Sequence, residues 1–332
     1  MFFEKFLNYI KNCDSIYIMG HKHSDLDSLG AALGLYNILC EFTNKINIIL
    51  NKEQSLAGNL LEYINNFLDL DKIILNNNTN ITPKSLLIIL DTHSKDYLES
   101  YDIYKSFDKN NIIIIDHHEI NTDKIIDYSL LIHDTSSSST CEIVTELIKN
   151  ININNKYNIK KLQAESLLSG IMLDTKNFVL NTSEKTFETA AYLKKYIKDN
   201  NFAIKKIFAS SINIHKIKSK IIENSEIYDN YIISVCPENI IINNNFKDLK
   251  LACTQAADEL LNIKNIEASF VIFQDNNNKG VGISSRSLGN INIYDIMKNL
   301  GGGGNNTMAA TYIPNSNINI IKQKIINILN KL

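Results

Sequence analysis

The stretch SIYIMGHKHSDLDSLGAALG, residues 15–34, joins a short apolar run to a helical pattern through a turn rich in histidine and aspartate. The run 15–20 is typical of a strand, and small and apolar residues recur at helical spacing from about Ser28 onward. The polar turn therefore follows the carboxyl end of a strand. Open α/β sheets carry their ligand sites at that edge. The stretch thus predicts an α/β fold, and Gly30 with its neighbouring alanines predicts close packing of the helix against the sheet.

Apolar runs and helical periods alternate along the first half of the chain. SLLIILD and NIIIIDHH, residues 85–91 and 111–118, are continuous apolar runs that end in polar residues. Strands that are apolar on both faces indicate a parallel sheet covered by helices on both sides. The first half is therefore expected to form a parallel-sheet domain with flanking helices.

A second strand-rich region begins near residue 226, after a long helical stretch. Within it, EASFVIFQD and GVGISSRS, residues 267–275 and 280–287, predict two paired strands joined by a turn at 276–279. We therefore expect a catalytic domain over residues 1–205, a linker helix over 206–225 and a smaller α/β domain over 226–332. The catalytic cleft is expected between the two domains.

The composition narrows the class of protein. The chain has 332 residues, 44% of them hydrophobic, and a formal charge of −2, which disfavours long DNA as a partner. Its five cysteines are scattered without a CxxC pair, as in a reduced, cytoplasmic protein. No apolar run approaches the roughly 20 residues that cross a bilayer, and the N-terminus lacks the pattern of a signal peptide. A cytoplasmic protein without a membrane segment is expected.

Metal-binding side chains gather at the ends of three predicted strands. Five of the seven histidines lie there. Each residue taken singly is better explained as a helix cap or a surface histidine, but their convergence at one sheet edge favours a metal site. The candidates are Asp25 and Asp27 with His21 and His23, then Asp91 with His93, then Asp116, His117 and His118.

This mixture of carboxylates and imidazoles suits Mn²⁺, Fe²⁺ or Zn²⁺ more than Mg²⁺. The donors suffice for two ions, which would share a bridging carboxylate and a hydroxide that attacks phosphorus. Asp174 ends another apolar segment, SLLSGIMLDT, and repeats the Asp-Thr ending of Asp91 and Thr92. Its segment leaves two interpretations open, a further ligand or an ordinary helix terminus.

Two features of the second region indicate a phosphate-bearing substrate. Arg286, beside Ser285, is the only arginine, whereas 33 of the 34 basic residues are lysines. A planar fork that binds phosphate through two hydrogen bonds is a role that lysine cannot fill. A run of four consecutive glycines has backbone amides that could approach an anion, although a flexible loop is the alternative explanation. The run consists of Gly301, Gly302, Gly303 and Gly304.

Four motifs in order, MGHKHSDLDSLGAALG, LDTH, IDHH and GIMLDTKNF, resemble those of the DHH phosphoesterases. ISSRSLGNINIYDIMKNLGGGG followed by AAT resembles the associated DHHA1 domain, so the resemblance covers nearly the whole chain. The amino-acid sequences of these motifs are most similar to those in the catalytic region of GdpP-type cyclic-di-AMP phosphodiesterases. They are less similar to those of NrnA-type enzymes, which degrade nanoRNA and dephosphorylate pAp.

The resemblance implies two Mn²⁺ ions per chain and a role for most of the candidates. Asp91 would bridge the ions, and Asp116 would orient the histidine pair, His117 and His118. The catalytic residues would be Asp91 and His118, with His118 either behind the metal ligands or in contact with the phosphate. His23 and His93 receive no certain role. The implied first ion is held by His21, Asp25 and Asp91, and the second by Asp27, Asp91, His117 and Asp174.

The same resemblance implies a set of substrate-binding residues and a homodimer. The family usually has histidine where this chain has Asn305, which affects the expected substrate preference. Full-length GdpP-type proteins carry membrane helices, a PAS domain and a GGDEF domain ahead of this region. The chain is therefore expected to be a stand-alone homologue or a fragment. The implied substrate-binding residues are Ser285, Arg286, Gly301, Gly302, Gly303, Gly304 and Asn305.

The expected reaction is hydrolysis of cyclic-di-AMP to pApA by a metal-bridged hydroxide. Two alternatives stay open. One is an NrnA-like oligoribonuclease or pAp phosphatase that acts on short linear nucleotides. The other, suggested only by Asn305, is an inactive nucleotide-binding module.

Overall fold

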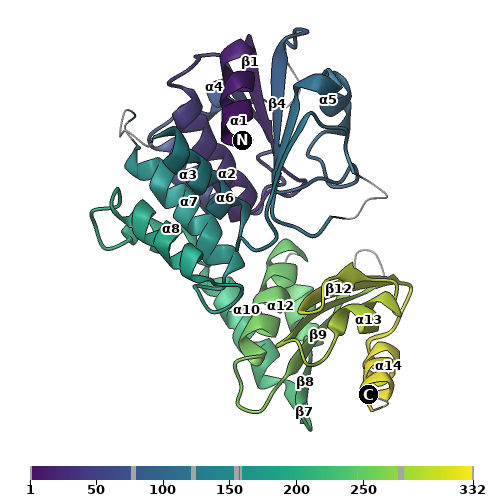
Figure 1. Ribbon diagram of the computed structural model, residues 1–332. Helices are drawn as coiled ribbons and strands as arrows, with labels where there is room; N and C mark the ends of the chain where they lie inside the picture. The colour runs from purple at the N-terminus through teal and green to yellow at the C-terminus, as the bar shows by residue number, and fades with distance from the viewer. Residues whose placement is uncertain are drawn as a thin grey trace. The chain divides into compact units, whose positions relative to one another are not determined.

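The computed structural model describes residues 2–75, 80–120, 125–152, 157, 159–244, 246–275 and 280–330 (Figure 1). The chain divides into two compact units, Met1–Ala209 and Ser210–Leu332. The division falls inside the range 206–225, where the sequence predicts a linker helix. Two helices occupy that region: α9 (Phe202–Ile207) belongs to the first unit and α10 (Ile212–Glu223) to the second.

The first unit is built on a parallel sheet, as the continuous apolar runs predict. Its strand order is β3-β2-β1-β4-β5-β6, and every neighbouring pair is parallel. From β1 the chain builds the sheet outward in one direction, and from β4 in the other, so the order reverses between β1 and β4. The strands are β1 (Ser15–Met19), β2 (Ile46–Ile49), β3 (Ile74–Leu75), β4 (Ser85–Leu90), β5 (Ile112–Asp116) and β6 (Leu130–His133).

Helices cover both faces of this sheet because alternate strand residues point to opposite sides. Ile16 and Ile18 of β1 pack into the larger hydrophobic core with α1, α2, α6 and α7, whereas Tyr17 and Met19 pack into a second core with α5. The helices of this unit, besides α9, are α1 (Phe2–Asn12), α2 (Leu26–Leu39), α3 (Gly58–Asn65), α4 (Leu70–Ile73), α5 (Tyr101–Lys105), α6 (Thr140–Ile151), α7 (Lys161–Asp174) and α8 (Glu184–Lys194), and a 3₁₀ turn spans Lys109–Asn111.

Gly30 of α2 faces neighbouring helices. A Cβ atom at this position would lie 2.5 Å from the Ser166 carbonyl oxygen on α7 and 3.1 Å from the Cys141 sulfur on α6. The expectation that Gly30 lets α2 approach the sheet is therefore wrong. The glycine instead allows α2 and α7 to pack with their backbones in close contact.

The second unit holds a mixed sheet of order β11-β12-β10-β9-β8-β7. The predicted pairing of β9 with β10 is confirmed and antiparallel, while the predicted turn at 276–279 lies outside the described residues. Among the described strands of this second sheet, only β8 and β9 pair in parallel. The strands are β7 (Ser225–Tyr228), β8 (Tyr231–Val235), β9 (Ala268–Asp275), β10 (Gly280–Ser287), β11 (Gly303–Gly304) and β12 (Met308–Pro314).

Two hydrophobic cores lie on the two faces of this second sheet. Val271 and Phe273 of β9 pack with α10 and α12, whereas Phe270 and Ile272 pack with α13 and α14. The helices besides α10 are α11 (Glu238–Asn243), α12 (Phe246–Leu260), α13 (Ile293–Lys298) and α14 (Ile318–Leu329). In the part of the chain that is described, no helix has both the length and the apolar character to cross a bilayer.

Candidate metal centre

The candidate centre lies at the carboxyl edge of the first sheet, where the strand order reverses between β1 and β4. Ligand sites of open α/β sheets form at such a point because the loops on either side diverge and leave room between them. The turn after β1 ends at Asp25, Asp27 lies in the first turn of α2, and the residue directly after β4 is Asp91. His117 follows β5, and Asp174 is the last residue of α7.

A first group of donors surrounds His21. Its Nε2 atom lies 3.3 Å from Asp91 Oδ2 and 3.7 Å from Asp25 Oδ1. These three side chains could hold a metal ion. Asp25 also caps α2, since its Oδ1 accepts hydrogen bonds from the Asp27 and Ser28 amides at 3.0 and 3.1 Å. The helix cap and the candidate ligand are therefore the same residue.

A second group surrounds His117. Its Nε2 atom lies 3.3 Å from Asp174 Oδ2, 3.6 Å from Asp91 Oδ1 and 4.0 Å from Asp27 Oδ2. Asp27, His117 and Asp174 could likewise hold a metal ion. Asp91 stands between the groups, with Oδ2 toward His21 and Oδ1 toward His117. All six residues named as ligands from the sequence thus come together, and their ligand role stays a prediction.

The chemistry of this donor set fits a divalent cation. His117 Nε2 is buried and has no hydrogen-bond partner among the described residues, although carboxylates lie on three sides of it. Burial lowers the pKa of His117, so the imidazole is neutral, the form that binds metals. Burial and the Asp27 charge raise the pKa of Asp91 to about 8 and that of Asp174 well above its ordinary value. A cation would satisfy the imidazole nitrogen and relieve this crowding of carboxylates.

The backbone of Asp91 is held in a left-handed conformation, with a φ of 62°. Non-glycine residues rarely adopt this region, although aspartate tolerates it better than most. Such strain persists where the surrounding structure enforces it, and it gathers at functional sites. Here it places the carboxylate of Asp91 between His21 and His117 directly at the end of β4.

The N-terminus of α6 holds two of the carboxylates. The Thr140 and Cys141 amides donate to the two oxygens of Asp27, each at 2.8 Å, and the Thr140 hydroxyl donates to Asp91 Oδ1 at 3.0 Å. A helix N-terminus favours negative charge because its amides lack partners within the helix. This role of Thr140 was missed from the sequence, because backbone amides and a single hydroxyl carry no distinctive sequence signal.

Asp116 is expected to orient His117 and His118, but in the structure it bonds to His118 and His93. It accepts hydrogen bonds from the backbone amide and Nδ1 of His118, and from Nδ1 of His93. Burial opposes ionisation of Asp116, but these bonds outweigh it and hold its pKa well below the ordinary value. His93 therefore has a buried supporting position, and His118 remains half exposed at the centre. His23 is exposed, and its Nδ1 lies 3.3 Å from the Gln54 carbonyl oxygen.

The candidate substrate residues lie in the second unit, and several of them hold its sheet together. Arg286 Nε donates to Asp258 Oδ1 at 2.7 Å, and one terminal nitrogen donates to the Ser285 carbonyl oxygen at 2.8 Å. The Ser285 hydroxyl is buried and donates to the Ala309 carbonyl oxygen at 2.7 Å. The guanidinium of Arg286 is thus fixed along one edge by Asp258.

The first half of the glycine run closes the end of α13. The amides of Gly301 and Gly302 donate to the carbonyl oxygens of Lys298 and Met297 at 3.0 and 2.8 Å. A Cβ at Gly302 would lie 2.4 Å from the Ala310 carbonyl oxygen, so this position requires glycine to pack against β12. The expectation that the amides of the run approach an anion is therefore wrong for Gly301 and Gly302, because both amides are bonded within the unit. Gly302 has a packing role there.

The second half of the glycine run and Asn305 form a tight turn. Gly303 and Gly304 pair with β12, and a Cβ at Gly304, whose φ is 137°, would lie 2.3 Å from the Met308 carbonyl oxygen. Asn305 Oδ1 accepts hydrogen bonds from the Thr307 amide, the Thr307 hydroxyl and the Met308 amide at 3.0, 3.1 and 2.8 Å. The residue in the family's histidine position therefore closes the turn that follows the glycines.

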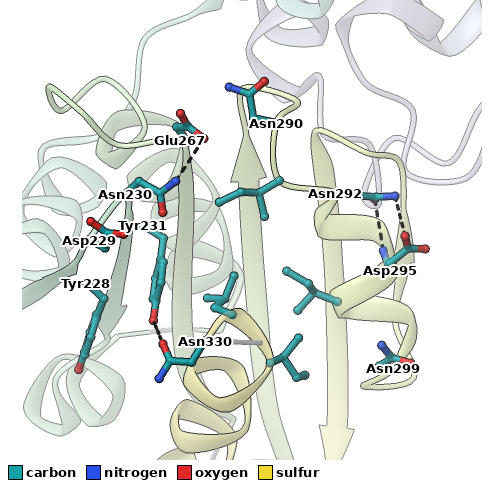
Figure 2. A pocket seen from close by; sticks show the side chains of 14 residues that line it. Tyr228, Asp229, Asn230, Tyr231, Glu267, Asn290, Asn292, Asp295, Asn299 and Asn330 are labelled. Carbon is teal, nitrogen blue, oxygen red and sulfur yellow. Dashed lines mark hydrogen bonds between the residues drawn. The ribbon is translucent and has the colours of Figure 1, made fainter. Parts of the chain in front are cut away.

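The second unit also contains a cavity of about 930 Å³ beside the β7–β8 turn (Figure 2). Tyr228 and Tyr231, whose rings stack at 5.6 Å, lie on one side of it, and Asp295 lies on the other. Asp229, Glu267 and Asp295 line the cavity, and none of its described lining residues is a lysine or arginine. This charge disfavours a phosphate group, so the cavity does not suit the phosphates of a nucleotide.

Comparison with known proteins identifies the class that this fold and donor set define. Residues 15–171 match the N-terminal domain of the DHH family, and residues 232–331 match the DHHA1 domain. The chain therefore belongs to the DHH/DHHA1 phosphoesterase family.

The chain is also similar in sequence to individual proteins of known name. The chain is 32% identical over 314 residues to the cyclic-di-AMP phosphodiesterase GdpP of Bacillus subtilis, a match that covers 92% of this chain and 46% of that protein. It spans just under half the length of the cyclic-di-AMP phosphodiesterases that it matches. The bifunctional oligoribonuclease and PAP phosphatase NrnA of Mycoplasma genitalium is 28% identical, with 93% of this chain and 92% of that protein covered.

A solved structure has the same fold. The crystal structure of an exopolyphosphatase-related protein from Bacteroides fragilis superposes with a TM-score of 0.80, at 21% identity. The match covers 98% of this chain and 95% of that one.

Proposed function

We propose that this chain is a Mn²⁺-dependent phosphodiesterase that opens cyclic-di-AMP to linear pApA. The observation that carries the proposal is the position of Asp91 between the two donor groups, with its carboxylate oxygens 3.3 Å from His21 Nε2 and 3.6 Å from His117 Nε2. Two divalent ions bound there would supply a nucleophile at neutral pH and neutralise charge on the phosphate. The likeness to a cyclic-di-AMP phosphodiesterase supports this choice of substrate.

The protein's own side chains have separate tasks in this proposal. Asp91 joins the two donor groups, and the amides at the α6 N-terminus hold the Asp27 carboxylate in place. His118 turns Nδ1 toward Asp116, which leaves Nε2 at the other end of its ring for the phosphate. Burial lowers the pKa of His118, but the nearby carboxylates outweigh burial and raise it to about 9, so His118 enters as a cation that can donate to phosphate.

The second unit supplies substrate contacts in the same proposal. Arg286 has donors left after binding Asp258, and these suit the non-scissile phosphate. Ser285 contributes by supporting Arg286 through its carbonyl oxygen.

The glycine run contributes through its lack of side chains. A Cβ at Gly301 or Gly303 would meet no atom within 4 Å, so a nucleotide ring can lie directly against the backbone at these two exposed positions. Gly302 supports them from the packed side of the run, and Asn305 fixes the turn that follows. An amide in place of the family's imidazole cannot carry a positive charge, which weakens the hold on phosphate.

A second candidate function is hydrolysis of short linear nucleotides, as the name of the NrnA relative states for that protein. The observation that favours it is the nearly complete coverage of both chains in that match. Initial rates with cyclic-di-AMP, pApA and pAp at equal Mn²⁺ separate the candidates. Faster turnover of cyclic-di-AMP supports the first proposal, and faster turnover of pApA or pAp supports the second. Tight binding without product would identify an inactive nucleotide-binding module.

The two-ion centre has its own test. Asp91→Ala should abolish turnover and reduce the bound Mn²⁺ from two ions to one or none, as measured on dialysed protein. Far-ultraviolet circular dichroism of the variant should match the wild type. Full turnover by Asp91→Ala protein that has been stripped and reloaded with Mn²⁺ would contradict the shared-ligand assignment.

We further propose that the enzyme is a cytoplasmic homodimer that contacts no membrane through this chain and binds no long DNA. The five cysteines are free, as in a reducing compartment, and a formal charge of −2 gives no overall attraction to a duplex. Light scattering coupled to size-exclusion chromatography gives the oligomeric state. Monomeric mass at micromolar concentration would contradict the dimer.

A further inference from the structure

The first turn of α8 contacts three segments near the metal centre through three consecutive side chains. Lys185 donates to Asp134 Oδ2 at 3.2 Å, in the loop that follows β6. Phe187 stacks on Phe178, in the loop that follows Asp174, with ring centroids 5.6 Å apart. Thr186, between them, donates to Glu142 of α6 at 2.8 Å. One helical turn thus joins separate parts of the unit that supply or support the donors.

Glu142 is a buried carboxylate that receives several hydrogen bonds at a single oxygen. Its Oε2 accepts from the Ser138 amide at 3.1 Å, the Ser138 hydroxyl at 2.6 Å and the Thr186 hydroxyl at 2.8 Å. Its exposed fraction is 0%, and Oε1 has no hydrogen-bond partner among the described residues. A buried carboxylate is costly, so its bonds strongly constrain the groups that donate them.

These groups are directly connected to the metal-binding carboxylates. Ser139 caps α6, since its hydroxyl accepts from the Glu142 amide at 3.1 Å. The next residue, Thr140, donates to both Asp27 and Asp91. A displacement of Glu142 would therefore move the amides and the hydroxyl that hold both carboxylates.

We propose that the Thr186–Glu142 contact is a positioning device for the metal centre. It fixes the α6 N-terminus, which holds Asp27 and Asp91, against the helix that follows the Asp174 loop. The proposal rests on the metal centre proposed above. It assigns Thr186 and Glu142 a role in metal affinity although neither belongs to the donor groups.

Helix capping alone would give Glu142 a simpler role. The sequence Ser139–Thr140–Cys141–Glu142 has the spacing of a capping box, in which the glutamate returns to an amide at the helix start. Capping does not require the bond from Thr186 of another helix. Loss of a cap lowers stability, whereas loss of a positioning contact also lowers metal affinity. The two roles are therefore separable by experiment.

The chain offers a matched control for this experiment. Thr189, one turn further along α8, is also fully buried and donates to Glu146 of α6 at 3.3 Å. Valine has nearly the shape of threonine and removes only the hydroxyl. Thr186→Val and Thr189→Val each remove a hydrogen bond between the same two helices, at different distances along α6 from its N-terminus. Thr186→Val also removes the acceptor of the Ser183 amide at the start of α8, so its stability is compared beside its metal affinity.

Calorimetric titration of metal-free protein with MnCl₂ measures the effect. Thr186→Val should weaken Mn²⁺ binding about 10-fold or more, as is usual for groups that support metal ligands, while Thr189→Val should stay within about twofold of the wild type. Thr186→Ser, which keeps the hydroxyl, should restore affinity. Equal affinity of Thr186→Val and wild type, or equal weakening by the two valine variants, would overturn the proposal.

A second pair of variants covers the case in which Thr186→Val misfolds. Glu142→Gln keeps an acceptor at the Oε2 position and should retain most of the affinity, whereas Glu142→Met should lose it. Glu146→Met is the control and should bind as wild type. Similar binding by Glu142→Met and Glu146→Met would overturn the positioning role. Absence of Mn²⁺ binding by the wild type would instead overturn the metal centre itself.

Discussion

Gly170 of α7 lies against the backbone of Asp27. Its replacement by alanine therefore tests whether metal binding depends on the exact position of Asp27. The new Cβ atom would lie 2.9 Å from both Cα and Oδ1 of Asp27, and 2.3 Å from the Cys141 sulfur. Ordinary contacts of a Cβ begin at 3.4 Å, so Asp27 must move by about 3.4 − 2.9 = 0.5 Å. The Cys141 thiol must also shift, which disturbs its hydrogen bond to the Asp27 carbonyl oxygen.

The expected effect on metal binding is larger than the effect on stability. Overpacking costs about 1–3 kcal/mol, and the preference of a helix for alanine over glycine offsets about 1 kcal/mol of that. The net loss of about 0–2 kcal/mol corresponds to a fall of a few degrees in Tm. Displacement of Asp27 from the Thr140 and Cys141 amides should weaken Mn²⁺ binding by about 10- to 100-fold.

Mn²⁺ titration and thermal unfolding of metal-free protein measure the two effects separately. Gly58→Ala is the control, because a Cβ at that position meets no atom within 4 Å. It should bind Mn²⁺ as wild type and unfold at the same or a slightly higher temperature. Wild-type affinity in Gly170→Ala would refute the view that the centre depends on the exact position of Asp27.

Three further outcomes follow from the described contacts. In metal-free protein, Tm should fall between pH 7 and 9. Burial lowers the pKa of His21 and His118, but neighbouring carboxylates outweigh it and raise these pKa values to about 11 and about 9, so the stabilisation from the protonated histidines is lost as pH rises, while ionisation of Asp91, whose pKa is about 8, adds a further cost. Saturating Mn²⁺ should reduce the fall in Tm, and a flat Tm profile without metal would contradict these pKa shifts. Asn305→Ala should destabilise the second unit by about 1 kcal/mol in urea unfolding because three donors lose their acceptor, whereas Asn305→Asp should not. Arg286→Lys should raise the KM for cyclic-di-AMP by about 10-fold with a smaller change in kcat, and an unchanged KM would exclude a phosphate-binding role.

The parallel sheet could be predicted because its central strands are long and continuously apolar. The apolar run at β4 predicts a buried strand on its own, without reference to the neighbouring strands. By contrast, β6 has only four residues and ends in a histidine, so it becomes a strand mainly through its pairing with β5. Gly30 and Gly302 show the same limit, since a sequence reveals that the backbone packs closely at a glycine but not which element it meets.

The donors at strand ends could be predicted because parallel strands bring their carboxyl ends to one edge. Asp174 could not be placed this way, since it ends a helix, and only the packing of α7 brings it within 3.3 Å of His117. Thr140 was missed for a related reason. The spacing of Ser139 and Glu142 predicts the start of a helix. It does not predict that the amide of Thr140 bonds to Asp27, which lies 113 residues away in the sequence.

The distribution of the donors along the chain has a consequence for protein synthesis. The first of the six is His21 and the last is Asp174, and the second group needs residues from both ends of that range. A ribosome must therefore have passed residue 174 before the full donor set exists. Products that stop earlier lack at least Asp174, so under the proposed assignment the second metal ion could bind only after α7 has been made.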